Sequence, residues 1–127
     1  MLEGIFGDST SESLVKGLDV VGLRHRVIAD NIANVETPGF TRSDVRFEEK
    51  LKQALGSSDE DVSGRIRNVT PDIQQDLTTP ARADGNNVSI DKEMSDMVKN
   101  TLEYEALVQL VNLKTAMLKS AITEGRR

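Results

Sequence analysis

The chain has 127 residues, the length of one small domain, and its 21 acidic and 16 basic residues give a net charge of -5. This balance argues against a nucleic-acid partner, whose phosphates require clustered Lys and Arg. The absence of cysteine excludes disulfides and thiolate metal sites, and a single histidine argues against a His-based metal site or catalytic triad. No nucleophile–base pair, phosphate-binding loop or carboxylate pair has supporting context, so we expect no enzyme activity, no cofactor and no small-molecule substrate.

The N-terminal part of the chain predicts a helix from about residue 10 to residue 34, with Ser9, Thr10 and Ser11 as candidate caps. Residues recur along it at alternating spacings of four and three, which is the pattern of a heptad seam. This seam consists of Leu14, Leu18, Val21, His25, Ile28, Ile32 and Val35. We interpret His25 as a packed or partly exposed side chain, because the sequence offers no further ligands for a metal.

The end of this helix carries the most specific local pattern in the chain, NIANVETPGF at residues 31–40. Asn34 tolerates the left-handed conformation that often ends a helix. A residue before proline favours extended geometry, and a Pro-Gly pair fits the centre of a type II turn. The pattern therefore predicts a sharp turn, although Pro-Gly turns also end many unrelated helices. The turn residues are Asn31, Asn34, Thr37, Pro38, Gly39 and Phe40.

The middle segment, residues 41–88, is polar and predicts little regular structure. A short amphipathic helix is expected around Phe47, Leu51 and Ala54, behind a possible Asp44 cap. Residues 56–61 are interpreted as a solvated loop, because they lack the ligand spacing of an EF-hand calcium site. Residues 65–77 show no clean periodicity and are expected to be irregular or a short edge strand.

The C-terminal part predicts a long helix over residues 91–124, about 50 Å in length, capped by Ser89 or Asp91. No Pro or Gly interrupts it. One apolar seam recurs at spacings of three and four and is expected to face the N-terminal helix. Its members are Met94, Met97, Thr101, Tyr104, Val108, Val111, Thr115, Leu118 and Ile122.

A second stripe lies on nearly the opposite side of this helix, since the two stripes are centred well over 90° apart at about 100° per residue. It consists of Leu102, Ala106, Leu110, Leu113, Met117 and Ala121. A helix with two apolar stripes needs two neighbours, and the middle segment is too polar to supply the second. We therefore predict an intersubunit interface with another copy or a related chain at Leu102, Ala106, Leu110, Leu113 and Met117.

Together these patterns predict a mainly α protein in which the N- and C-terminal helices form a coiled-coil-like α-helical hairpin. The expected segments are residues 1–40 with the helix and its turn, an irregular or flexible middle segment at 41–88, and the C-terminal helix at 89–127. The expected intrachain seam joins Leu14, Leu18, Val21, Ile28 and Ile32 to Val108, Val111, Leu118 and Ile122.

The turn pattern resembles the signature of the bacterial flagellar axial proteins, which include the rod, hook and hook-associated subunits. That signature, N-I-A-N-x-x-T-P-G-[Y/F], is matched at every fixed position, with Phe40 in the aromatic position. Residues 42–48, 84–94 and 104–109 are similar to segments of a proximal-rod member of this family. The chain is also too short to hold the inserted outer domain of hook or distal-rod proteins.

This resemblance implies a structural subunit of the proximal rod, whose hairpins pack side by side around a central channel and transmit torque. It implies export by the flagellar type III system without a cleaved signal peptide and a place in the periplasmic rod of the basal body. The implied partners are further copies of the chain, sibling rod proteins, and the export gate or its MS-ring adaptor. Two alternatives stay open: a sibling proximal-rod subunit, and a soluble helical adaptor or export chaperone.

Overall fold

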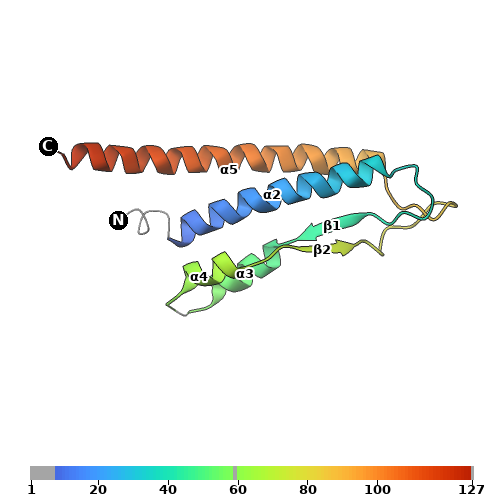
Figure 1. Ribbon diagram of the computed structural model, residues 1–127, viewed down its shortest axis with the longest axis horizontal. Coiled ribbons are helices and arrows are strands. Elements are labelled where there is room, and N and C mark those ends of the chain that lie inside the picture. The colour runs from blue at the N-terminus through green and yellow to red at the C-terminus, as the bar shows by residue number, and fades with distance from the viewer. Residues whose placement is uncertain (1–7, 59, 127) are drawn as a thin grey trace.

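The computed structural model of the protein describes residues 8–58 and 60–126, and within them the fold is mainly α, as predicted. The elements in chain order are α2 (Ser9–Ala33), β1 (Ser43–Arg46), α3 (Glu48–Gly56), α4 (Val62–Asn68), β2 (Asp72–Gln75) and α5 (Ile90–Glu124). The molecule is elongated, with α2 and α5 side by side and antiparallel (Figure 1). Residues 1–7, which begin the predicted 1–40 segment, lie outside the described residues, as do residue 59 of the acidic loop and residue 127.

One residue, which the sequence pattern does not indicate as a cap, both caps α2 and bonds to α5. The cap is Asp8, which has extended backbone geometry and accepts a hydrogen bond from the Ser11 N–H at 3.0 Å. The predicted caps Ser9, Thr10 and Ser11 are therefore wrong. Lys114 of α5 also donates to Asp8 at 2.6 Å, so this carboxylate both caps α2 and joins it to α5.

Helix α5 spans 35 residues and begins at the predicted cap Ser89, whose hydroxyl accepts from the Lys92 N–H. Because Lys114 pairs with the residue before α2, the last ten residues of α5 continue past the start of α2 (Figure 1). None of the helices in residues 8–58 and 60–126 combines the length and the apolar character that crossing a bilayer requires.

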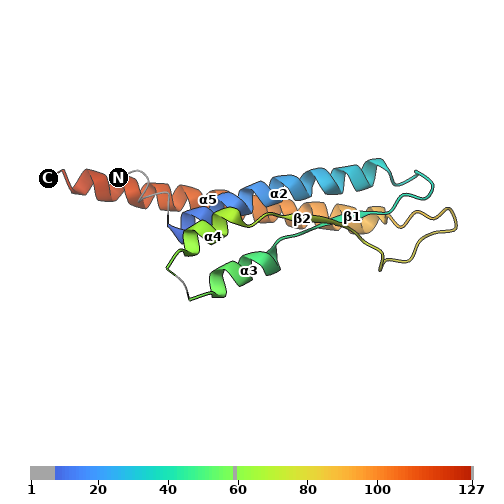
Figure 2. The same ribbon diagram turned by 60° about the horizontal axis from the view of Figure 1, so that its bottom comes forward.

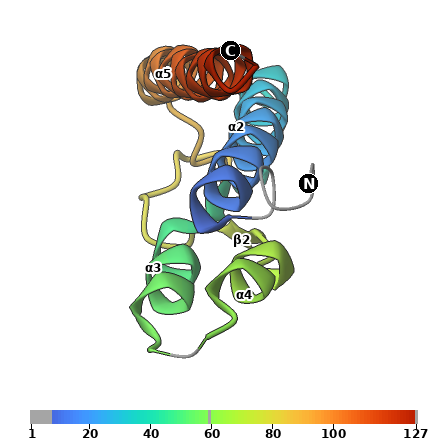
Figure 3. The ribbon, with the colours of Figure 1, turned by 90° about the vertical axis from the view of Figure 1, so that its left-hand side faces the viewer.

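The middle segment packs on the side of α2 that faces away from α5, so α2 lies between α5 and the pair α3–α4 (Figure 3). Strands β1 and β2 form an antiparallel pair with Val45 opposite Ile73. The main core cluster joins Val20 of α2 to Val45 and Phe47, with four partly buried neighbours. The middle segment therefore covers α2 and leaves the far side of α5 open.

The middle segment is more regular than its sequence predicts. Helix α4 occupies residues 62–68, part of which was expected to be irregular or a short strand. It is held by the Asp61 cap, which accepts from the Gly64 N–H at 2.9 Å, and by Ile66, which is fully buried. The predicted Asp44 cap of α3 is also wrong, because Asp44 lies in β1 and Phe47 is the N-cap. Strand β2 agrees with the strand alternative for residues 65–77.

Candidate assembly interface

The turn after α2 is held by a hydrogen bond between two of its own side chains and by a glycine with positive φ. Helix α2 ends at Ala33, and Asn34 caps it with φ -103°. Asn34 does not adopt the left-handed conformation that it tolerates; within the described residues, the positive φ values belong to glycines. The Thr37 hydroxyl donates to Asn34 Oδ1 at 3.1 Å. Gly39 has φ +73°, the left-handed region that glycine enters at little cost.

The turn packs directly against the loop that leads into α5, and both lie at the same end of the molecule (Figure 2). The Gly39 N–H donates to the Asp84 carbonyl at 2.9 Å. Asn86, which is fully buried, donates its side-chain amide to the carbonyls of Asn34 and Thr37, both at 2.8 Å. Gly85 has φ +84°, and a Cβ there would lie 3.3 Å from the Gly39 Cα. The two segments that resemble the axial family are thus in contact in space.

Asn31 fixes the direction in which the chain leaves this turn. Its side chain is 1% exposed, and it exchanges two hydrogen bonds with the Ser43 backbone, each of 2.9 Å. The same amide donates to Glu93 in the first turn of α5 at 3.1 Å. One buried side chain of α2 therefore holds both the first residue of β1 and the beginning of α5.

A buried ion-pair cluster joins the middle segment to the hairpin beside Asn31. Arg42 donates to Glu93 at 2.6 Å and to Asp76 at 2.8 Å, and its side chain is 4% exposed. Hydrogen bonds from Thr78 and Thr79, together with the Arg42 guanidinium, hold the pKa of the Asp76 carboxyl well below its usual range. Because a buried carboxylate is costly unless it is paired, the burial of Glu93 depends on its ion pair with Arg42.

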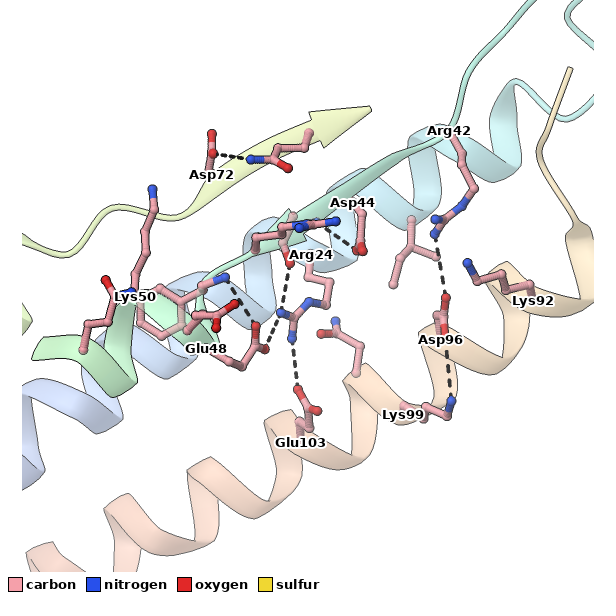
Figure 4. A pocket seen from close by; sticks show the side chains of 18 residues that line it. Arg24, Arg42, Asp44, Glu48, Lys50, Asp72, Lys92, Asp96, Lys99 and Glu103 are labelled. Atoms are coloured by element: carbon pink, nitrogen blue, oxygen red, sulfur yellow. Dashed lines mark hydrogen bonds and ion pairs between the residues drawn. The ribbon is translucent and has the colours of Figure 1, made fainter. Parts of the chain in front are cut away.

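A groove of about 860 Å³ runs along the molecule between α5 and the β1–α3 segment, with charged side chains of both signs on its walls. Arg24 crosses it, bonding to Glu48 at 2.5 Å and to Glu103 at 3.3 Å, and so links α2 to α3 and α5 (Figure 4). Asp96 lies between Arg42 and Lys99 in the same view. No group of three or more His, Cys, Asp or Glu side chains among the described residues has the arrangement of a metal site.

The residues predicted for the intrachain seam differ in their burial. Val21 and Ile28 are buried, at 5% and 4% exposure. Ile122 is 56% exposed and belongs to the part of α5 that continues past α2. His25 is exposed. The remaining members are partly buried: Leu14, Leu18, Ile32, Val108, Val111 and Leu118.

The first half of α5 turns polar side chains toward α2, whereas the sequence pattern predicts apolar ones there. Glu93 and Asn100 are buried, and the Asn100 amide donates to the Val21 carbonyl at 3.0 Å. Met94 and Tyr104, which were predicted for the seam, are 49% and 50% exposed. Relative to the predicted seam, α5 is turned about its own axis, because Glu93 and Asn100 bond to buried polar groups of α2.

The second stripe of α5 is open to solvent along its whole length. Leu102 is 60% exposed, Leu110 50%, Leu113 58% and Met117 61%, and Ala106 is exposed as well. Burying such a side chain completely is worth about 1.5–3 kcal/mol, so leaving four of them in water forgoes several kcal/mol. Contiguous exposed apolar surface of this kind marks a site of protein–protein contact.

The fold and this stripe define a class of protein: an elongated helical hairpin whose longest helix has one face covered by α2 and an apolar stripe that is left uncovered. Comparison with known proteins makes the assignment specific. No protein-family model matches the chain. The flagellar basal body rod protein FlgB of Borrelia hermsii is 37% identical over 108 residues, which cover 73% of this chain and 80% of that protein.

The FlgB proteins of Bacillus subtilis and Escherichia coli are also similar to this chain. The first is 33% identical over 124 residues, covering 92% of this chain and 95% of the relative. The second is 30% identical over 124 residues, covering 87% and 90%. The chain therefore belongs to the family of flagellar basal body rod proteins FlgB, which confirms the resemblance seen in the turn pattern.

Proposed function

We propose that this chain is a structural, non-catalytic subunit of the proximal rod of the bacterial flagellar basal body. Family membership supports the rod subunit over a sibling rod protein and over an adaptor or export chaperone. The observation that carries the proposal is the uncovered second stripe of α5. Hairpins that pack side by side cover this stripe, enclose the export channel and transmit torque along the helices.

The proposed interface consists of Leu102, Ala106, Leu110, Leu113 and Met117. The proposed partners are other copies of the chain, sibling rod proteins, and the export gate or MS-ring adaptor at the base of the rod. We further propose that the subunit reaches the periplasmic rod through the flagellar type III system without cleavage of a signal peptide. The turn residues Asn31, Asn34, Thr37, Pro38, Gly39 and Phe40 set the end of the hairpin that enters these contacts.

The test replaces Leu110 and Leu113 with Asp and scores export and rod incorporation separately. Two charges in the interface should abolish incorporation and leave export intact, because unpaired buried charges are strongly disfavoured. A variant carrying Thr101→Asp and Asn112→Asp is the matched control, since it adds the same charge to exposed positions of α5 outside the stripe. Normal incorporation of the leucine variant would contradict the proposed interface.

A further inference from the structure

The outer face of α2, on the side that neither α5 nor the middle segment covers, carries three small residues, Gly22, Ala29 and Ala33. The exposed residues of α2 around them are Val15, Asp19, His25, Arg26 and Asp30. A Cβ at Gly22 would have no neighbour within 4 Å, whereas a Cβ at Gly17 would lie 3.2 Å from Leu107. A glycine inside a helix costs about 1 kcal/mol relative to alanine. Contacts within the described part of the chain account for Gly17 but not for Gly22.

The second stripe of α5 presents large side chains that can fit over the small residues Gly22 and Ala29 of α2. We consider one antiparallel register of the two helices. It sets Leu102 opposite Ala29, Leu110 beside Gly22, and Met117 beside Val15. Two helices pack closely when large side chains of one helix fit into the grooves over small residues of the other.

The same register brings together two exposed side chains of opposite charge. Arg26 of α2 and Glu105 of α5 are exposed, and neither has an ion pair among the residues that the structure describes. With Leu102 opposite Ala29, Glu105 lies opposite Arg26. The match of charge therefore agrees with the match of size at one alignment of the two helices.

We propose that the second stripe of one copy docks on the α2 outer face of a second copy, with Leu102 beside Ala29 and Glu105 beside Arg26. This inference rests on the proposed function and names the surface that covers the stripe. Within one chain, Asn100 bonds to Val21, so the intrachain register differs by roughly seven to ten residues. The second copy is therefore displaced by about 10–15 Å along the helix axis. Such a contact joins two different faces, and repeated it generates a ring or a helical array.

Disulfide trapping tests the register directly, because the chain contains no cysteine of its own. The full-length chain carrying Ala29→Cys and Leu102→Cys is oxidised with copper phenanthroline, and linked species are separated on a non-reducing gel. The matched control carries Ala29→Cys and Leu113→Cys, which also removes one leucine but lies about 16 Å out of register. We expect linked dimers and higher oligomers at least about fivefold more abundant from the in-register pair, since a disulfide needs close Cα atoms.

Charge reversal gives a second readout on the same assembly. In the cysteine-bearing chain, Arg26→Glu and Glu105→Arg should each lower the yield of linked species several-fold, and the two together should restore it. Equal yields from the two cysteine pairs, or no rescue by the double reversal, would overturn the proposed docking. If neither cysteine pair gave linked species, a second copy of the chain would be excluded as the partner that covers the second stripe. The Leu110 and Leu113 variant tests the rod proposal separately, so a failed register leaves that proposal standing.

Discussion

Replacing Arg42 by methionine should be among the most destabilising single changes in the protein. The substitution keeps much of the apolar length of the side chain and removes the guanidinium that bonds to Glu93 at 2.6 Å and to Asp76 at 2.8 Å. Glu93 is 0% exposed, so it would be left as a buried charge without its cation. Breaking a buried pair in this way costs about 3–5 kcal/mol.

This loss is large beside the total stability of a small domain, which is about 5–15 kcal/mol. With urea m-values of about 1–3 kcal/mol/M, the unfolding midpoint should fall by at least about 1 M. Urea unfolding followed by circular dichroism at 222 nm measures it directly. The result reports on the junction between the middle segment and the hairpin, because Arg42 joins this segment to α5.

The double variant Arg42→Met with Glu93→Met distinguishes the cost of leaving Glu93 without its cation from the cost of removing both charges. With both charges gone, no carboxylate remains buried at position 93, and at least about half of the lost stability should return. Glu93→Met alone also removes the acceptor for Asn31 and completes the cycle. A loss below about 1 kcal/mol for Arg42→Met would refute the buried cluster as the joint between the two parts of the fold.

Four further substitutions probe the helices. Gly22→Ala should raise the free energy of unfolding by about 0.5–1 kcal/mol, and Gly17→Ala should raise it less, because a leucine side chain of α5 lies 3.2 Å from the new Cβ; equal gains in chemical denaturation would contradict the close approach. The pKa of Asp8 is lowered from 3.8 to about 2, first by the hydrogen bond from Lys114, so its contribution is full above about pH 4 and is lost as the pH falls through 3.8 toward 2. Asp8→Asn should flatten that part of the stability–pH profile, and an unchanged profile would exclude the pair. Asp61→Ala should cost about 0.5–2 kcal/mol through loss of the α4 cap, and hydrogen exchange of the α4 amides should show it first.

The hairpin could be predicted because its information is local and periodic. Apolar residues at spacings of three and four mark both long helices, and Ser89 has the chemistry of a cap. Helix α4 carries no such signal, since Val62, Ser63 and Gly64 are weak helix formers. It forms because the Asp61 cap and the burial of Ile66 outweigh that local preference.

The burial of the polar groups that join α5 to α2 and to the middle segment could not be predicted, because charged residues are almost always exposed unless they are paired. Nothing near Arg42 in the sequence indicates that Asp76 and Glu93, far along the chain, provide its partners. Glu93 and Asn100 occupy the face of α5 toward α2, whereas the pattern of apolar residues predicts Met94 on that face. The turn residues were identified from their pattern, whereas their contacts with the loop at residues 84–87 required the structure.

The accessibility of the second stripe, before and after assembly, tests the central claim most directly. Leu113→Cys introduces a unique thiol at a position that is 58% exposed in the single chain. A maleimide reagent should label it rapidly in the free subunit and at least about tenfold more slowly in assembled rods. Ser58→Cys in the exposed loop after α3 is the control, and we expect it to react equally in both states. Equal labelling of the Leu113→Cys thiol in free subunits and in rods would contradict the claim that another chain covers the stripe.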